Sequence, residues 1–116
     1  MVSIQLDIAY VLFDLGATHS FVSPVYAGRL GIDRKPLPIP LDVATPVGGN
    51  IIVGFCYEHC AVTICDHVLY ADLIELPMLE FDVILGMDWL TTNKAMIDCF
   101  MKRIDFGLGD RETFSL

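Results

Sequence analysis

The stretch of sequence that decides the fold is VLFDLGATHSF, residues 11–21. Its three apolar residues Val11–Phe13 run without alternation, which is typical of a strand buried on both faces. Asp14 follows directly, and Gly16 gives the backbone the freedom for a sharp turn. A carboxylate held at the end of a buried strand is a candidate for acid–base chemistry. The alternative is an ordinary turn-forming aspartate that bonds its own backbone.

Strand patterns surround this stretch on both sides. Val2–Ile8 alternates apolar and polar residues, and Phe81–Gly86 repeats the shape of an apolar strand that ends in glycine. Two strand-like arms flank a turn with Gly48 and Gly49 at its tip, which predicts a hairpin. The arms and the remaining strand candidates are Leu41–Thr45, Ile51–Val53, Cys60–Ile64, Leu69–Leu76, Met96–Cys99 and Arg103–Phe106.

Two short helices are predicted between these strands. Ser23 as N-cap and Pro24 at the first helical position predict a helix over Val25–Leu30. Asp88 is expected to cap a second helix that runs to Asn93.

At least seven short strands with two short helices indicate an all-β barrel or sandwich. The chain has 116 residues, 54% of them hydrophobic, which is enough for one compact domain and too little for two. We expect this domain over residues 1–107 and a frayed C-terminal tail over residues 108–116. The mean hydropathy of +0.58 is high for a small domain and suggests an interface between subunits.

The order of these stretches resembles a known family. Residues 11–21 are similar to the active-site strand and loop of retropepsin-like aspartic proteases, whose pattern is two apolar residues, Asp, Ser or Thr, Gly and Ala. Further stretches resemble the family in the same order: Pro46–Gly49 as the flap tip, Ala71–Ile74 as a core strand, Phe81–Leu90 as the apolar segment with its glycine and helix, and Ala95–Cys99 as its continuation. The resemblance is closer still to the protease domain of gypsy-type LTR retrotransposon polyproteins, and it spans roughly residues 10–106.

The resemblance implies a retropepsin-like acid protease barrel with one lobe per chain, closed by homodimerisation. It makes Asp14 the catalytic residue of an aspartic endopeptidase that processes a retrotransposon polyprotein. The implied active-site loop also contains Leu15, Gly16, Ala17 and Thr18. The implied substrate-binding residues are His19, Thr45, Val47, Gly48, Gly49 and Ile84.

The chemistry of peptide hydrolysis by carboxylates also requires a dimer. One carboxylate must activate water while a protonated one polarises the carbonyl, and the chain has one Asp-x-Gly loop of this type. A two-fold axis would place Asp14 of one copy beside Asp14 of the other, so that the two share one proton. The nucleophile is then a water molecule, and no metal or other cofactor is needed.

Leu15 departs from the family pattern, which has Ser or Thr at this position. In the family, the hydroxyl bonds across the dimer axis, and leucine cannot make that bond. The loss of two symmetric hydrogen bonds costs the pair about 1–3 kcal/mol. The alternative function is therefore a retrotransposon-derived dimeric binding module with impaired catalysis.

Charge and cysteine spacing weigh against two other classes of ligand, nucleic acid and zinc. Seven Lys and Arg against fifteen Asp and Glu give a net charge of -8, which excludes nucleic acid as an expected partner. The sequence contains neither an apolar run long enough for a membrane span nor a signal peptide, so we expect no membrane partner and a cytoplasmic location. The family resemblance adds virus-like particles as an expected location. A zinc module is a third, remote alternative, built on the cluster of Cys56, His59, Cys60, Cys65 and His67, whose spacing fits no common zinc pattern.

Overall fold

A computed structural model describes residues 2–44, 48–98, 100–101, 103–108 and 112–115. The described strands are β1 Val2–Ile4, β2 Asp7–Ile8, β3 Val11–Phe13, β4 Phe21–Val22, β5 Lys35–Ala44, β6 Asn50–Ile64, β7 His67–Glu75, β8 Val83–Leu85, β9 Ala95–Asp98, β10 Arg103–Leu108 and β11 Glu112–Ser115. The described helices are α1 Pro24–Ala27 and α2 Met87–Thr92. The expected mostly β fold with short helices is confirmed.

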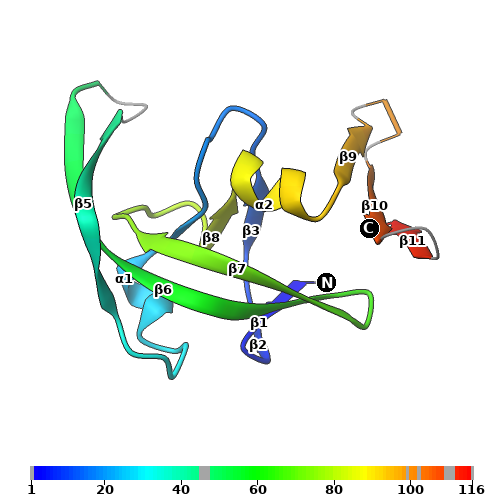
Figure 1. Cartoon of the computed structure of the whole chain (residues 1–116), viewed down its shortest axis with the longest axis horizontal. Coiled ribbons are helices and arrows are strands. Elements are labelled where there is room, and N and C mark those ends of the chain that lie inside the picture. The colour runs from blue at the N-terminus through cyan, green and yellow to red at the C-terminus, as the bar shows by residue number, and fades with distance from the viewer. Residues whose placement is uncertain (1, 45–47, 99, 102, 109–111, 116) are drawn as a thin grey trace.

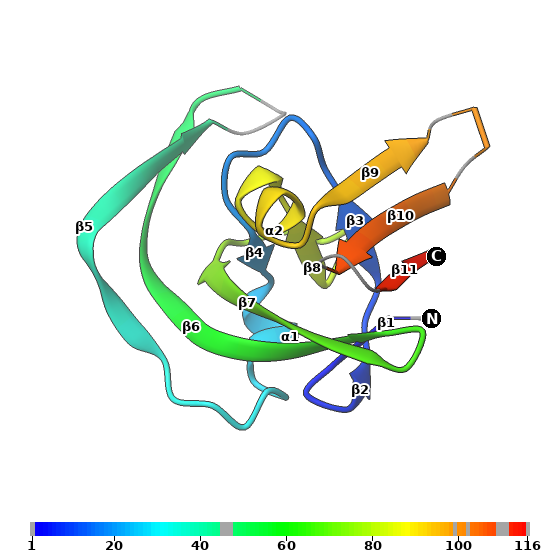
Figure 2. The same cartoon turned by 45° about the vertical axis from the view of Figure 1, so that its right-hand side comes forward.

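Most strands form one curled sheet that resembles half of a barrel (Figure 1). Its order is β2-β1-β6-β7-β4-β8-β3, and β5 pairs with β6 as an additional branch. The β5–β6 hairpin arches away at one end of the molecule, and a three-stranded sheet of β9, β10 and β11 lies at the other end (Figures 1 and 2). Helix α2 lies between these two ends in both views.

The core forms because alternate residues of β6 and β7 point to the same face of the sheet. Val62 and Ile64 of β6 and Leu69, Ala71 and Leu73 of β7 are all buried in one cluster. A smaller cluster lies under the arching hairpin and is centred on Phe21, Val53 and Ile74. The second cluster places apolar side chains next to the loop that follows β3.

The predicted first strand is wrong in its length. Val2–Ile8 folds as two short strands, β1 and β2, that pair with each other through Ile4 and Asp7. Gln5 and Leu6 form the turn with φ of 51° and 68°, a conformation that side chains other than glycine rarely adopt. The turn is held because the Gln5 Oε1 accepts a hydrogen bond from the Ala61 N–H at 2.7 Å. Such a distant partner leaves no mark in the local pattern.

The first and second strand candidates after the hairpin tip are in fact one strand. Ile51–Val53 and Cys60–Ile64 both belong to β6, which pairs with β5 on one side and with β7 on the other. The register with β7 shifts between Tyr57 and Cys60, where an irregularity interrupts the ladder. The predicted hairpin around the two glycines is confirmed, because Ala44 pairs with Asn50.

Both helices are present, but their ends differ from the prediction. Ser23 caps α1 as expected, since its Oγ accepts a hydrogen bond from the Tyr26 N–H at 3.1 Å. The helix ends at Ala27, and the chain continues to Leu30 through i to i+3 bonds that wind it more tightly. Helix α2 begins at Met87, so Asp88 lies in its first turn and is not its N-cap. None of the described helices is long and apolar enough to cross a membrane.

The expected frayed tail contains a strand. Residues 112–115 form β11, which pairs antiparallel with β10 from Asp105 to Leu108. The predicted hairpin of β9 and β10 is confirmed by the register of Ile97 with Ile104. β11 is short and has no alternating apolar pattern, so its pairing with β10 defines it more than its own sequence does.

Candidate active site

Asp14 stands at the carboxyl end of two parallel strands. β3 and β8 pair in parallel through Phe13 and Leu85, and the Asp14 N–H continues the ladder by donating to the Leu85 carbonyl at 2.9 Å. The carboxylate is half-buried, and its Oδ1 accepts a hydrogen bond from the Gly16 N–H at 2.8 Å. The Oδ2 accepts no hydrogen bond within the described part of the chain. Asp14 therefore does form a turn with its own backbone, and its Oδ2 is left without a hydrogen bond.

A cleft of about 440 Å³ opens beside Asp14. Its walls come from the loop after β3 and from the facing strand β5, and its apolar lining includes the small cluster under the hairpin. The residues that line it are Asp14, Gly16, Ala17, Thr18, His19, Phe21, Leu41, Asp42, Val43, Ala44, Leu76 and Ile84. No Lys or Arg of the described ranges lines this cleft, which leaves Asp14 and Asp42 as its charged groups.

Most of the residues expected at the site gather around the cleft. Asp14, Gly16, Ala17, Thr18, His19 and Ile84 line it. Leu15 is not part of the lining, and 54% of its surface is exposed. Gly48 and Gly49 lie in the β5–β6 connection with φ of 94° and 74°, a conformation suited to glycine, and they do not line the cleft. Thr45 and Val47 lie outside the described residues.

Sequence reasoning missed the apolar side of the cleft. Phe21 from β4, Leu41 and Val43 from β5, and Leu76 after β7 bring apolar surface to it. The alternation of Leu41 and Val43 in the hairpin arm was a usable signal, because both side chains must lie on one face of a strand. Nothing in the local sequence of Phe21 or Leu76 indicates that they meet across the fold.

The loop after β3 is held in place by the start of α2. Gly86 lies so close to this loop that a Cβ on it would overlap the His19 carbonyl oxygen and lie 2.7 Å from the Ala17 carbonyl oxygen. The Met87 N–H donates to the same Ala17 carbonyl at 2.7 Å. Glycine is thus required at this position by contact and not by its backbone angles.

A buried serine completes the attachment. Ser20 is fully buried; its Oγ donates to the Asp88 Oδ1 at 2.7 Å and accepts from the Gly86 N–H at 3.0 Å. The same Asp88 oxygen accepts from the Trp89 N–H at 2.7 Å. Ser20 and Asp88 are 68 positions apart, so the contact that fixes the loop has no local signature.

The imidazole of His19 faces a different partner. Its Nδ1 lies 2.9 Å from the Thr18 Oγ1, a distance that fits a hydrogen bond in either direction, depending on the tautomer. Both side chains are exposed at the rim of the cleft. The pair is therefore available to a ligand that enters from solvent.

The cysteine and histidine cluster does not assemble into a metal site in the described part of the chain. No three His, Cys, Asp or Glu side chains gather around one point there. Cys60 is buried in the core, and its Sγ donates to the Tyr57 carbonyl at 3.5 Å. The ring of His59 stacks on Tyr70 instead, with centroids 3.9 Å apart.

The half-barrel with an aspartate turn at its cleft defines the class of protein. The fold is similar to that of the retroviral protease-like domain of Ddi1 from Leishmania major, with a TM-score of 0.70 and 20% identity over 97% of this chain and 86% of that one. It is also similar to EIAV protease complexed with the inhibitor HBY-793, with a TM-score of 0.66 and 21% identity over 84% of this chain and 88% of that one. These likenesses show a retropepsin-like fold.

A comparison of the sequence with protein families then identifies the family. Residues 1–112 match the profile of the family described as retroviral aspartyl protease, and the chain belongs to that family. Among curated proteins, no sequence match is significant. Membership confirms the retropepsin part of the resemblance and implies aspartic endopeptidase chemistry for the family as a whole.

Proposed function

We propose that this chain is an aspartic endopeptidase that acts as a homodimer through Asp14 of each copy. The observation that carries the proposal is the position of Asp14: it lies at the end of the β3–β8 pair and lines a cleft, with one carboxylate oxygen uncommitted. Membership of the retroviral aspartyl protease family supports the same assignment.

The need for a second carboxylate supports the dimer. Hydrolysis by two carboxylates requires one that accepts the proton of the attacking water and one that donates a hydrogen bond to the peptide carbonyl. No other carboxylate of the described residues lines the cleft except Asp42, which is exposed on the opposite strand. A symmetric partner would supply the missing group from its own Asp14, and the exposed Leu15 beside it would lie near the axis.

In this dimer, the paired carboxylates share one proton. The ionised member takes a proton from water, the resulting hydroxide attacks the carbonyl carbon, and the protonated member hydrogen-bonds the carbonyl oxygen. The tetrahedral intermediate then collapses as the C–N bond breaks, and the carboxyl group that took a proton from water gives it to the leaving amine, which returns the pair to one shared proton. We expect activity to favour mildly acidic conditions, because a shared proton is lost as pH rises.

The cleft fits an extended peptide with an apolar side chain. Phe21, Leu76 and Ile84 offer apolar surface, and β5 offers a strand along which a peptide backbone could lie. We further propose that the β5–β6 hairpin closes over the peptide as a flap. The proposed substrate is the polyprotein of a gypsy-type retrotransposon, cleaved in the cytoplasm or in virus-like particles.

One observation favours a second candidate function. Leu15 stands where the family pattern has a hydroxyl, and its side chain is exposed in the single chain. A dimer that lacks the hydroxyl bonds could hold its carboxylates out of position, because a displacement of about 1 Å costs on the order of 100-fold in rate. A dimeric peptide-binding module with impaired catalysis would result.

The substitution Asp14→Asn tests the catalytic assignment. An amide cannot accept the proton of water, so we expect peptide cleavage to fall to background, while a chelator leaves the wild-type rate unchanged. Asp33→Asn is the matched control, because Asp33 is exposed and its substitution removes the same negative charge. Cleavage of a fluorogenic peptide library at several pH values measures both. Full activity in Asp14→Asn would remove Asp14 from the mechanism.

Analytical ultracentrifugation tests the dimer separately. We expect the wild-type chain to sediment as a dimer at micromolar concentration and a peptide-like inhibitor of aspartic proteases to strengthen the association. A monomer at all these concentrations, with and without the inhibitor, contradicts the proposal. Dimerisation without any cleavage in the library favours the binding module.

A further inference from the structure

One continuous series of hydrogen bonds runs from Asp14 to helix α2. The Asp14 N–H donates to the Leu85 carbonyl at 2.9 Å. The Gly86 N–H belongs to the same peptide group as this carbonyl, and it donates to the Ser20 Oγ at 3.0 Å. The Ser20 hydroxyl donates in turn to the Asp88 Oδ1 at 2.7 Å. A single peptide group is therefore bonded to Asp14 at one end and to Ser20 at the other.

All donors of this hydrogen-bond series point the same way, toward the carboxylate of Asp88. Hydrogen bonds aligned in this way polarise one another, and an anionic acceptor at the end strengthens them further. Leu85, Gly86 and Ser20 are buried, so water does not replace a missing partner in the middle of the series. Asp88 is exposed and lines a cavity of about 310 Å³ beside α2. The series thus has a buried middle and an anionic end at the surface.

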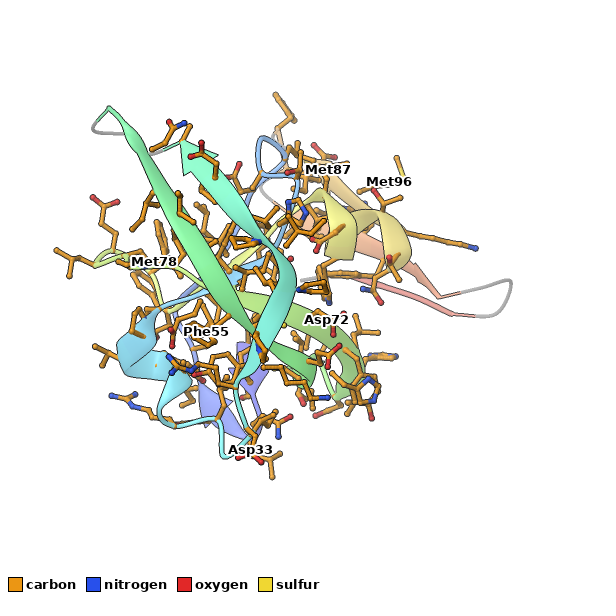
Figure 3. The ribbon with its side chains drawn as sticks, turned by 60° about the vertical axis from the view of Figure 1, so that its left-hand side comes forward. Asp33, Phe55, Asp72, Met78, Met87 and Met96 are labelled. Carbon is orange, nitrogen blue, oxygen red and sulfur yellow. The ribbon has the colours of Figure 1, made fainter. Side chains whose placement is uncertain are left out.

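The hydrogen-bond series acts on a different part of the loop than the other attachment to α2. The Met87 N–H holds the Ala17 carbonyl, and Figure 3 shows Met87 at the start of α2, beside this loop. Ala17 lies three positions after Asp14, whereas the series through Ser20 reaches the N–H of Asp14 itself. Without the Ser20 hydroxyl, a buried N–H would be left unpaired, and the peptide group that holds Asp14 would turn toward another acceptor.

We propose that Ser20 is a positioning residue for the reaction of Asp14. Its hydroxyl fixes the peptide group between Leu85 and Gly86, and this group fixes the backbone from which the Asp14 carboxylate extends. The inference rests on the proposed endopeptidase function, in which two carboxylates must meet in a set geometry. A displacement of about 1 Å costs on the order of 100-fold in rate. Neither Ser20 nor Asp88 lines the cleft, so the series affects the rate and not the binding of the substrate.

Two substitutions of Asp88 test the exposed end of the series. Asp88→Ala removes the acceptor of the Ser20 hydroxyl, so we expect kcat to fall about tenfold at saturating dimer concentration, with KM within about twofold. Asp88→Asn keeps a side-chain oxygen that accepts the same bond, so its kcat should stay within about twofold of the wild type. Thr92→Ala is the matched control. The Thr92 hydroxyl donates to the Asp88 backbone carbonyl at 2.8 Å, outside the series, so both constants should be unchanged.

Ser20→Ala breaks the series in the middle. We expect the same loss of kcat as in Asp88→Ala. The double variant should stay within about twofold of either single one, because both substitutions interrupt the same series. Two independent defects of folding would instead multiply their losses. If Ser20→Ala does not fold, the two Asp88 variants still test the inference.

NMR of the full chain labelled with ¹⁵N separates this inference from the proposed function. In Ser20→Ala and Asp88→Ala, the Asp14 amide proton should shift upfield and exchange faster with solvent, because its bond to the carbonyl weakens. In Asp88→Asn and Thr92→Ala, the same signal should keep its position and its exchange rate.

The inference is overturned if the Asp14 signal is unchanged in both alanine variants. It is also overturned if the losses of kcat multiply in the double variant, if KM rises while kcat is kept, or if Thr92→Ala loses as much kcat as Asp88→Ala. A wild type that cleaves no peptide contradicts the proposed function instead. The Asp14 signal then decides alone whether Ser20 fixes the backbone of Asp14.

Discussion

Asp14 fills two roles with the two oxygens of one carboxylate. The Oδ1 closes the turn by accepting the Gly16 N–H, and this bond fixes the direction of the side chain. The Oδ2 accepts no hydrogen bond from a described group, and Asp14 lines the cleft. A group that takes part in its own turn is held more rigidly than one that does not, which suits a reaction sensitive to small displacements.

At the same scale, we expect the contact between two such loops in the proposed dimer to depend on Leu15. Leu15→Ser is expected to raise the peptidase rate, because the hydroxyl restores a donor at each half of the proposed axis. The rate should rise more than the dimer affinity, since contacts elsewhere in the dimer remain while the carboxylate geometry improves. A dilution series measures the dimer, and a fluorogenic peptide at saturating dimer concentration measures the rate.

Leu79→Ser is the matched control for this change. Leu79 is fully exposed, at 103% of its reference surface, and lies outside the cleft lining, so the same substitution there should leave the rate unchanged. If Leu15→Ser is no faster than an already competent wild type, leucine is tolerated and the impaired-module alternative fails. If neither cleaves any library peptide, the endopeptidase proposal gives way to the binding module.

At the scale of elements, the junction of β8 and α2 holds the loop after β3 in place. Gly86 makes the closest approach, and Met87, Asp88 and Ser20 add hydrogen bonds around it. The loop therefore depends on a helix start more than 60 positions away in the sequence. This dependence predicts that a single methyl group at Gly86 is harmful.

Gly86→Ala is expected to destabilise the fold by about 3 kcal/mol or more, because the new Cβ overlaps backbone that cannot move aside cheaply. Gly54→Ala is the control: no atom lies within 4 Å of a Cβ there, and its φ is outside the left-handed region. We expect that substitution to change stability by less than about 1 kcal/mol. Urea unfolding followed by circular dichroism measures both, and equal effects would contradict the close contact.

At the scale of the whole molecule, two buried weakly acidic groups make the fold less stable at strongly alkaline pH. Burial, with smaller contributions from Asp7 and Asp82, raises the pKa of Tyr26 from 10.0 to about 12. Burial, followed by the charge of Asp72, raises the pKa of Cys60 from 9.0 to about 12. In both cases the folded protein favours the neutral form. The stabilisation is complete below the unfolded pKa of each group and is lost as pH rises toward about 12, because the unfolded chain ionises first.

Tyr26→Phe separates these two groups. The variant loses the hydrogen bond from the Tyr26 hydroxyl to the Asp7 carbonyl, 2.7 Å long, so we expect it to be about 1 kcal/mol less stable at pH 7. Above pH 10 its stability should fall less steeply than that of the wild type, since one ionisation is removed. Urea unfolding at pH 7, 9 and about 11 measures this difference. Parallel curves for the two proteins would contradict the assignment.

The sequence by itself determined the mostly β fold, the strand that leads into Asp14, the hairpin around Gly48 and Gly49, and the family resemblance. These features depend on neighbours within a few residues: an apolar run indicates a buried strand, and the aspartate and glycine after it indicate a turn. The residues of the loop after β3 that line the cleft could be named for the same reason.

Only the tertiary structure decided how that loop is held and what faces it. Ser20 meets Asp88, and Gln5 meets Ala61, through hydrogen bonds between distant segments. A hydrogen bond between residues far apart in the chain leaves no pattern in the sequence around either of them. The sequence around a serine or a glutamine therefore does not show whether the side chain is buried or which distant group it bonds. The apolar wall of the cleft and the cavity beside α2 exist only because folding brings those segments together.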